Sequence, residues 1–310
     1  MSFALPVFII AVGGIYCERS GIVMLALEGL QGFGAFVGAV AVVFCEQQFG
    51  SSPYLPFLAM ATAIIGGAFY SMLHGVLCVR FRANQIISGV VVNILAVALT
   101  TFLTSVMNLM LTGNGSNKFQ FSVSPRFTLP VLSSIPVLGG LFKNMYPFEI
   151  VILIIAFLMW YVLNHTKYGL RLRACGDNPH SLDAAGGNVD QVHFSAVMIS
   201  GALAGLGGIC FAYSISASFG PNIYMGYGFL AIAAFIFGNW KILPTFAVCL
   251  FFGFARSGGY QLIQALGLTS NFSDLLMIIP YVLTLFLLIF FSKQNHPPRA
   301  SGEIFDKGKR

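Results

Sequence analysis

Charged residues are scarce in this sequence. They make up 8% of its 310 residues, whereas hydrophobic residues make up 57%, and the mean hydropathy is +0.84. This composition excludes a soluble domain and predicts a polytopic membrane protein. The net charge of +6 does not indicate a nucleic-acid partner, because the basic residues flank apolar runs, as membrane orientation requires.

Several motifs are missing as well. The six cysteines include no C-x-x-C pair, which argues against a metal site or a disulfide framework. The sequence has no G-x-x-x-x-G-K-[ST] loop, so the chain cannot bind and hydrolyse ATP through a P-loop of its own. It also lacks the series of intramembrane Asp, Glu and His residues that proton-driven carriers use, and no Ser-His-Asp set stands out. We therefore expect a protein that is not an enzyme.

Long apolar runs define the expected fold. A helix needs about 20 residues to cross about 30 Å of hydrocarbon; several runs exceed this length, and others are short enough for half-helices. We predict an all-α membrane domain over residues 1–292 with about eight to ten transmembrane helices, some of them short or broken, and a basic, solvated tail over 293–310 near anionic lipid. The runs cover about 2–15, 21–45, 54–79, 86–111, 148–164, 194–216, 227–239, 242–255 and 274–291.

The basic residues predict how the chain lies in the membrane. If the C-terminus is inside and the spans alternate, twelve basic residues fall on the cytoplasmic side and four on the other. The C-terminus and the loop over about 165–193 are then cytoplasmic, and Met1 lies outside, before a first run of about 14 residues that is short for a span. The twelve are Arg19, Arg80, Arg82, Lys167, Arg171, Arg173, Lys241, Lys293, Arg299, Lys307, Lys309 and Arg310, and the four are Lys118, Arg126, Lys143 and Arg256.

Another loop, over about 112–147, falls on the outer side and is rich in Gly, Ser, Asn and Pro. Loops of this length usually have a function or are disordered. Two interpretations stay open: a passive cover over the helix ends, or a surface for a solute-delivering protein.

The stretch from Lys167 to Val189 is the one long polar segment between two strongly apolar runs. We expect Gly169 to end the preceding helix, and Asp177-Asn178-Pro179 is a helix-start signal because Asn caps free N–H groups and proline lacks the donor that would go unpaired. Gly186-Gly187 supplies a stop, which leaves a helix of about seven residues, or roughly 10 Å, across the membrane surface. Such a helix can fit a partner's groove, although an ordinary amphipathic connection explains the same pattern.

Glu28 is an acidic residue within an apolar run. A carboxylate in hydrocarbon is costly unless it is partnered, protonated or facing water, so Glu28 is a functional candidate. The alternative is a hydrogen bond to a neighbouring helix that holds the bundle together.

Amides at Asn84, Gln85 and Asn93 stand at the start of, and within, another apolar run. Such amides tie helices together, each bond contributing about 0.6–2 kcal/mol. Packing is the favoured interpretation, and a position on the pore wall is the alternative.

The run from Phe219 to Trp240 contains Gly and Pro at positions that suit broken helices, which expose backbone groups to a cavity. Its aromatic residues are of a kind that can stack on a base or sugar ring. For Tyr224 and Trp240 we favour the simpler role of anchors at the membrane interface.

Several short motifs of this sequence resemble those of a known family. G-L-R-L-R-A-C-G-D-N-P, then A-A-G-G-N-V, then S-G-A-L-A-G-L-G-G at Ser200 to Gly208 closely resemble the coupling region of the permease subunits of ABC importers, in the subgroup that serves nucleosides, ribose-type sugars and branched-chain amino acids. G-x-Y-x-E-R-S-G-I-V and L-x-L-E-G-L, at Gly14 to Val23 and Leu25 to Leu30, resemble the family's signature near its first spans. This chain has Met24 where many members have Asn before the L-E-G word.

The resemblance implies that the helix over 177–187 sits in a cleft of a separate ATPase subunit, which binds the ATP and Mg. It implies a pore-forming permease in a bacterial cytoplasmic membrane, with a second, homologous or identical permease chain, an extracytoplasmic solute-binding protein and membrane lipid as partners. Nucleosides are the expected solute, with a ribose-type sugar, a branched-chain amino acid or a flavin as alternatives; an ion-coupled secondary transporter and an inactive membrane scaffold are rivals from other classes. The expected coupling residues are Arg171, Arg173, Gly176, Asp177, Asn178, Pro179, Ala184, Ala185 and Gly186, and those of the translocation pathway are Glu28, Asn93, Asn222 and Phe229.

Overall fold

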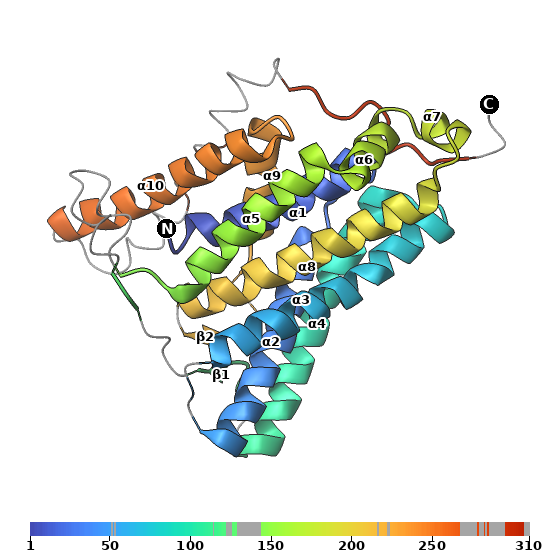
Figure 1. Cartoon of the computed structure of the whole chain (residues 1–310). Helices are drawn as coiled ribbons and strands as arrows, with labels where there is room; N and C mark the ends of the chain where they lie inside the picture. The colour runs from blue at the N-terminus through green and yellow to red at the C-terminus, as the bar shows by residue number, and fades with distance from the viewer. Residues whose placement is uncertain are drawn as a thin grey trace.

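Long helices form most of the chain in a computed structural model (Figure 1). The structure describes residues 1–50, 52, 54–113, 115–121, 126–128, 144–215, 217–221, 224–266, 278, 282, 284 and 295–306. The helices are α1 (Ala4–Arg19), α2 (Leu27–Phe49), α3 (Leu55–Gly75), η1, a π-helical turn (Val76–Arg80), α4 (Gln85–Thr112), α5 (Pro147–His165), α6 (Lys167–Asp177), α7 (Pro179–Ala184), α8 (Val189–Ile215), α9 (Tyr227–Phe237) and α10 (Ile242–Leu266).

Six helical segments of the described residues are long and apolar enough to cross a membrane. The prediction of an all-α polytopic membrane protein is confirmed. Helix α9, with 11 residues, is too short to span by itself, as expected for a broken helix. The six are Leu27–Phe49, Leu55–Arg80, Gln85–Leu111, Pro147–His165, Val189–Ile215 and Ile242–Gly259; most of the last predicted run, 274–291, lies outside the described residues.

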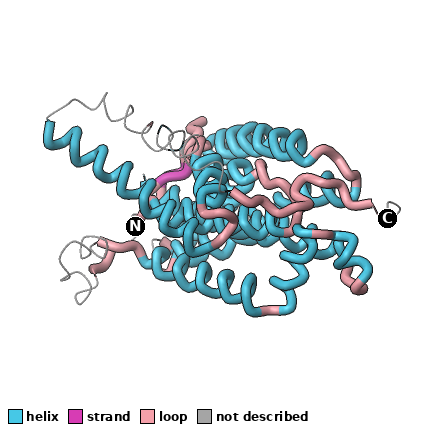
Figure 2. Tube along the Cα trace, turned by 90° about the horizontal axis from the view of Figure 1, so that it is seen from above, coloured by secondary structure: helices cyan, strands magenta, loops and turns pink. Residues whose placement is uncertain are grey.

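Helix α1 lies at the centre of the bundle. It is apolar all round, which predicts burial on every side, and all of its residues from Ala4 to Glu18 are buried. It packs against α8, α9, α10 and α5 (Figure 1). Figure 2 shows the molecule from above, with helices making up most of the described chain. With 16 residues it is about 24 Å long.

The glycine-rich word at Ser200 to Gly208 is a packing surface. A side chain at Gly205 would overlap the backbone of Ala63 in α3, and one at Gly201 would overlap the backbone of Gly67. The absence of side chains lets α8, α3 and α2 approach backbone to backbone, which is how membrane helices gain dispersion contacts without a hydrophobic effect.

Other helices keep broad apolar faces uncovered. Most of α4 faces outward, and its exposed large side chains include Ile86, Ile87, Val90, Val91, Ile94 and Phe102. In a membrane such a face contacts lipid or another membrane chain, so it needs no polar cover.

The end of the molecule near Met1 carries a short two-stranded sheet. Strand β1 (Phe119–Gln120) pairs antiparallel with β2 (Ser218–Phe219), and both phenylalanines lie against Phe36 of α2, with ring centroids 6.4 and 5.9 Å away. The described part of the 112–147 loop therefore packs against the middle of α2. Residues 129–143 lie outside the described part of the chain.

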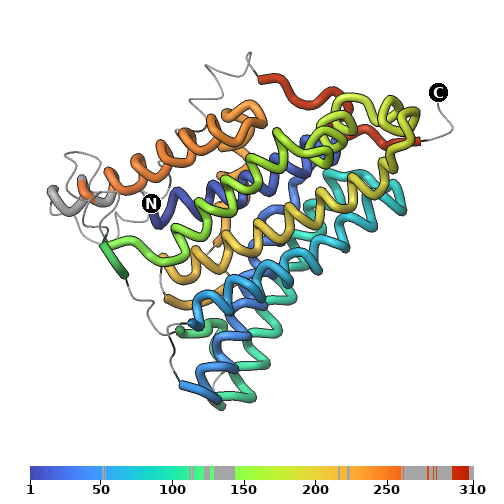
Figure 3. The backbone as a smooth tube through the Cα atoms, viewed as in Figure 1, coloured from blue at the N-terminus to red at the C-terminus, as the bar shows by residue number. Residues whose placement is uncertain are grey.

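The structure corrects two sequence predictions about the opposite end. Gly169 does not end the preceding helix; α5 ends at His165 and Gly169 lies inside α6. The tail is not simply solvated either, since Pro298 and Ala300 are buried and residues 295–306 run along the end of the bundle that holds α6 and α7 (Figure 3).

Candidate functional site

A sharp corner joins α5 to α6. Thr166 ends one helix and begins the next: its hydroxyl donates to the Val162 carbonyl at 2.6 Å and accepts from the Gly169 N–H at 3.3 Å. A side chain at Gly169 would overlap the carbonyls of Val162 and Leu163. Gly169 therefore has a structural role, because only a residue without Cβ fits against the end of α5.

Helix α6 is fixed to the bundle by its buried face. A side chain at Gly176 would overlap the Arg19 carbonyl at the end of α1, and the Cys175 Sγ lies 3.2 Å from His193 Nε2, which in turn lies 2.9 Å from the Ser20 carbonyl. Burial raises the pKa of the Cys175 thiol to about 12, so the thiol is neutral at physiological pH. These contacts join α6 to both α1 and α8.

Helix α7 is the short, capped helix that the sequence predicts. The Asn178 side chain accepts from the Ser181 N–H at 3.2 Å, and Pro179 occupies the first turn. The chain leaves the helix through Gly186, whose φ of +80° favours glycine. The helix has six residues, slightly fewer than predicted, because Ala185 already stands at its end.

The nine predicted coupling residues gather at one end of the molecule but do not form one face. Gly176 and Pro179 are buried, and Arg173 is half-buried, with its Nε donating to the Gly169 carbonyl at 3.3 Å. Six are exposed: Arg171, Asp177, Asn178, Ala184, Ala185 and Gly186.

The E-R-S-G word holds this end of α1 to the turn between α9 and α10. Glu18 accepts from the Trp240 indole N–H at 2.5 Å and from the Met24 N–H at 3.4 Å, and the Arg19 Nε donates to the Trp240 carbonyl at 3.1 Å. Trp240 is 6% exposed, so the prediction of a membrane-interface anchor is wrong for it. Its indole is a buried hydrogen-bond donor.

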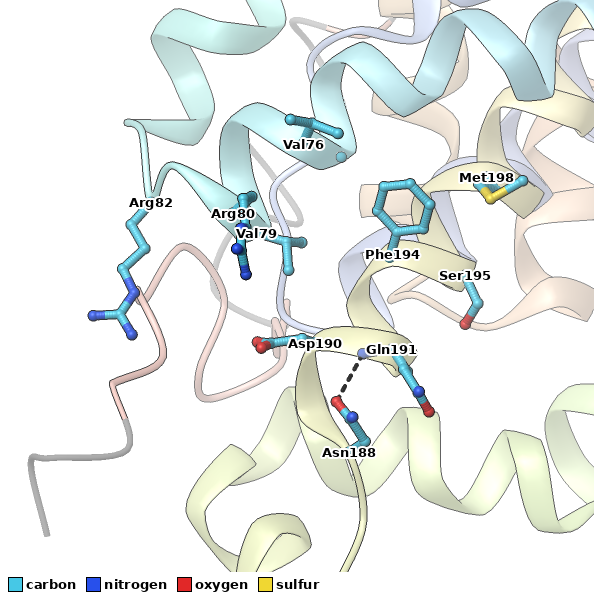
Figure 4. A pocket seen from close by; sticks show the side chains of 11 residues that line it. Val76, Val79, Arg80, Arg82, Asn188, Asp190, Gln191, Phe194, Ser195 and Met198 are labelled. Atoms are coloured by element: carbon cyan, nitrogen blue, oxygen red, sulfur yellow. Dashed lines mark hydrogen bonds between the residues drawn. The ribbon is translucent and has the colours of Figure 1, made fainter.

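A cavity of about 540 Å³ opens beside α7 (Figure 4). It lies between the end of α3 with η1 and the start of α8, next to Asn188, whose side chain caps α8 by accepting from the Gln191 N–H at 3.1 Å. Its floor is apolar and its rim polar. The lining residues are Gly75, Val76, Val79, Arg80, Arg82, Asn188, Asp190, Gln191, Phe194, Ser195 and Met198.

A second polar cluster lies inside the bundle, where α2 meets α9. The Glu28 Oε1 accepts from the Gly226 N–H at 2.9 Å, just before the start of α9. A side chain at Gly228 would come within 2.7 Å of the Glu28 backbone, so the two helices nearly touch. The Glu28 Oε2 is buried and has no hydrogen-bond partner among the described residues.

Gln31 and Tyr224 extend this cluster. The Gln31 side chain donates to the Tyr224 carbonyl at 2.9 Å, and the Tyr224 hydroxyl lies 3.4 Å from the Thr100 hydroxyl of α4. Tyr224 is 2% exposed, because its ring lies over Gly32. It is therefore not an interface anchor, and that prediction is also wrong.

Asn93 bridges α4 to the start of α2. Its amide donates to the Leu25 carbonyl at 2.8 Å and accepts from the Gly29 N–H at 2.7 Å. Both bonds go to backbone groups within three residues of Glu28. The structure thus places Asn93 close to Glu28. The Asn93 amide also joins α4 to α2 by hydrogen bonds, which agrees with the packing interpretation.

Of the other two pathway candidates, Phe229 meets Glu28 through its backbone N–H, which hydrogen-bonds to the Glu28 carboxylate, while its side chain points away from the pair. Phe229 lies on α9 with 52% of its surface exposed, and Asn222 lies outside the described residues. Of the amides at the start of α4, Asn84 caps the helix, and Gln85 accepts from the Val23 N–H at 2.7 Å.

Sequence analysis overlooked several buried polar residues. Glu149, in the first turn of α5, accepts from the Ser2 hydroxyl at 2.8 Å, although its place inside an apolar run gave the same signal as that of Glu28. Arg256 of α10 donates to the Tyr227 hydroxyl at 2.7 Å and lies over the Phe3 ring, 4.2 Å from its centroid. The E-R-S-G motif drew attention to Glu18, but the buried hydrogen bonds of Glu18 and Gln31 were not predicted, since their partners come from distant parts of the chain.

Comparisons with known proteins cover nearly the whole chain. Residues 1–288 match the model of the family described as branched-chain amino acid transport system / permease component. The chain is 35% identical to the guanosine ABC transporter permease protein NupQ of Bacillus subtilis and 35% identical to the nucleoside ABC transporter permease protein NupC of Lactococcus lactis, each alignment covering 99% of this chain and 95% of the relative.

A third relative comes from the same organism as the first. The guanosine ABC transporter permease protein NupP of Bacillus subtilis is 28% identical, with 85% of this chain and 73% of NupP covered. No solved structure matches the chain.

Proposed function

We propose that this chain, which belongs to the family of branched-chain amino acid transport system permease components, is a pore-forming subunit of an ATP-driven importer of nucleosides. The similarity to NupQ and NupC, at 35% identity over 99% of the chain, carries the proposal. The sequence has no P-loop, so the ATP and Mg belong to a separate ATPase subunit.

In this proposal α7 is the element that docks to the ATPase. It is short, capped at both ends and exposed along His180, Ser181 and Ala184. A helix whose terminal backbone N–H and C=O groups are hydrogen-bonded keeps its shape when a partner pushes on it. Such a helix can transmit a displacement as a rigid body.

The route from α7 into the bundle follows its buried contacts. Movement of α7 carries α6 with it, and α6 is joined to α1 through Gly176 and to α8 through Cys175 and His193. Helix α1 packs on α8, α9 and α10. An ATPase that favours one pore state can therefore shift the whole bundle through differential contact with α7.

The cavity beside α7 supports the same role. Its apolar floor and its rim of Arg80, Arg82 and Asp190 suit a projecting side chain of the docked ATPase (Figure 4). We propose that α7 and this cavity bind the ATPase together.

We place the solute pathway at the polar cluster of Glu28 and Asn93, with the start of α9 as its movable wall; Asn222 and Phe229 flank that start in the sequence. The Glu28 Oε1 already accepts from Gly226, so the Oε2 is the oxygen available for a solute hydroxyl. A ribose ring offers such hydroxyl donors, which fits the nucleoside assignment.

A second permease chain completes the pore in this proposal. The uncovered apolar faces of α4 and α10 are long enough for a helix partner in the membrane. Since Bacillus subtilis has both NupQ and NupP, and this chain resembles each of them, we propose that the partner is a related chain and not a copy.

The orientation follows from the charges. Arg19, Arg82 and Arg173 lie at the α7 end by their contacts, so that end faces the cytoplasm under the positive-inside rule. The C-terminus is then cytoplasmic, the membrane is the bacterial inner membrane, and an extracytoplasmic binding protein delivers solute at the Met1 end.

Reconstitution tests the proposal. The chain, its partner permease and its ATPase are placed in vesicles with the binding protein, and uptake of labelled guanosine is measured with and without ATP. We expect ATP-dependent uptake of guanosine and none of ribose. Equal uptake without the ATPase would refute the importer mechanism, and uptake of ribose alone would refute the nucleoside assignment.

A further inference from the structure

The C-terminal residues 295–306, here called the C-terminal strap, are folded against the α7 end. The Ala300 N–H donates to the Gly176 carbonyl of α6 at 2.9 Å, and the Gly302 N–H donates to the Gly21 carbonyl at 2.9 Å. The His296 N–H donates to the Asn239 side chain, also at 2.9 Å. Three backbone donors of the strap are thus bound to three different parts of the bundle.

The strap continues to two more elements. The Phe305 ring lies on the His180 ring of α7, with centroids 5.2 Å apart, and Asp306 lies 3.4 Å from Arg82, in the turn before α4. The strap therefore contacts α6, α7, the turn after α1, the turn between α9 and α10, and the turn before α4, and its course along this end of the bundle can be followed in Figure 3.

Its backbone is shaped for this course. Gly302 has a φ of +82° and Gly21, which it contacts, a φ of +105°; both values lie in the region that favours glycine. The Ser301 and Glu303 N–H groups close turns onto the Pro298 and Ala300 carbonyls at 3.1 and 3.2 Å. A tail that is not attached to the bundle would need neither tight turns nor buried residues. The strap therefore has a defined position on the bundle.

The outer edge of the strap is apolar where it meets α7. Ile304 is 52% exposed, and Phe305 packs on the exposed His180. Ile304 and Phe305 thus stand together beside the exposed face of α7, the helix that we propose docks to the ATPase.

We propose that the C-terminal strap and α7 form one continuous docking surface for the ATPase subunit, in which Ile304 and Phe305 supply the apolar contact and the strap holds α7 to the bundle. This inference rests on the proposed function. The facing part of the ATPase is apolar, and exposed Arg171 and Arg299 on either side favour acidic residues at its margin.

Ile304→Asp tests the contact directly. The side chain is exposed, so the variant should fold, and a charge in an apolar interface should weaken ATPase binding about tenfold. Affinity of the purified full-length chain for its purified ATPase is measured in nanodiscs, with Ile304→Val as the matched control, which should bind normally. Unchanged affinity of Ile304→Asp would overturn the proposal.

Gly302→Val provides an independent test. The substitution forces a branched side chain into a left-handed backbone 3.4 Å from Val23, so it should displace the strap. Gly50→Val is the control, since Gly50 has a similar φ of +73° at the end of α2 with open space around it. We expect ATP hydrolysis stimulated by solute to fall about fivefold or more in Gly302→Val alone.

The two proposals fail differently. If the unmodified chain neither binds the ATPase nor transports, the proposed function is wrong. If the unmodified chain does both and Ile304→Asp binds as tightly as Ile304→Val, the strap is no part of the docking surface; if Gly302→Val matches Gly50→Val, the strap does not hold α7 to the bundle.

Discussion

Helix α7 and the Glu28 cluster both carry polar groups in an apolar molecule, yet the caps of the helix and the groups of the cluster find their partners at different distances along the chain. At the α7 end the caps are local: Asn178 bonds three residues ahead, and Asn188 does the same for α8. At the Glu28 cluster the partners come from far away, as with Gln31 and Tyr224.

In the proposed function, this difference separates the docking helix from the solute pathway. The caps of α7 come from its own neighbours in the chain and do not depend on contacts with other helices. Distant partners make the Glu28 cluster depend on how α2, α4 and α9 sit together, and two of its buried oxygens, Glu28 Oε2 and Gln31 Oε1, have no hydrogen-bond partner among the described residues.

The largest effect is expected where α6 contacts the end of α1. Gly176→Val places a branched side chain against the Arg19 carbonyl, and backbone cannot yield as a side chain can, so we expect a loss of about 3 kcal/mol or more. The measurement is the yield of folded chain in detergent by size-exclusion chromatography.

Gly186→Ala is the control for Gly176→Val. Gly186 also tolerates poorly any residue with Cβ, because of its φ of +80°, but nothing lies within 4 Å of it. Its cost should be about 1–2 kcal/mol. Equal yields of the two variants would show that α6 does not rest on the end of α1 as described.

The next largest effect is expected at α7 itself. Ala184→Pro removes a backbone donor from the last turn of α7 and sets the proline ring against the preceding turn, at about 3 kcal/mol for the helix. Because α7 lies outside the bundle core, membrane insertion should persist and solute-stimulated ATP hydrolysis should be lost. Ala184→Ser, which keeps the helix, should remain coupled; normal stimulation in Ala184→Pro would rule out α7 as the coupling element.

A charge removal at Glu28 tests the pathway. Glu28→Gln keeps an oxygen that can accept from Gly226 but loses the carboxylate. If Oε2 binds a solute hydroxyl, the KM for uptake should rise about tenfold, because a hydrogen bond to a charged group contributes about 1.5–3 kcal/mol and one to a neutral group about 0.5–1.5 kcal/mol.

The response of stability to the same change distinguishes the two roles of Glu28. Thermal unfolding in detergent should change little for Glu28→Gln and clearly for Glu28→Ala, which leaves the Gly226 N–H unpaired. An unaltered KM in Glu28→Gln would leave the carboxylate as a cap for α9 only, the alternative that the sequence kept open.

The separation of hydrogen-bond partners along the chain explains what the sequence could predict. The caps at Asn178-Pro179 and Gly186 were predicted because cap and capped group are neighbours in the chain. The roles of Trp240 and Tyr224 were not, because their partners, Glu18 and Gln31, lie 222 and 193 residues away. No spacing rule connects residues so far apart.

The helical fold itself was readable from the apolar runs, whereas the corner at Thr166 was not. Glycine is a typical helix-stop residue, but Gly169 lies inside α6, where the absence of Cβ lets this helix approach the end of α5 closely. The course of the tail could not be predicted either. The prolines and basic residues of 293–310 are typical of solvated chain ends, and only the fold brings the tail to Gly176 and Gly21.

A smaller effect should come from Asn93→Leu. The change removes two hydrogen bonds, to Leu25 and Gly29, and membrane bonds of this kind average about 0.6 kcal/mol each. We expect a loss of about 1–2 kcal/mol in unfolding free energy, with Ile94→Leu, on the exposed side of the same turn, as a control without effect. A larger loss in transport than in stability would move Asn93 from packing into the solute pathway.

The smallest effect is expected at Arg82. Its ion pair with Asp306 is open to solvent, with the two side chains 53% and 39% exposed, and such pairs contribute about 0–1 kcal/mol. Arg82→Ala should therefore leave the C-terminal strap in place, and hydrogen exchange at the Ala300 amide, which is bound to Gly176, should match that of Arg82→Lys. Faster exchange in Arg82→Ala, or in the unmodified chain at high salt, would mean that charge and not the buried backbone bonds holds the strap. The α7 end would then be sensitive to its ionic surroundings, and the strict division between a rigid docking helix and an adaptable solute pathway would no longer stand.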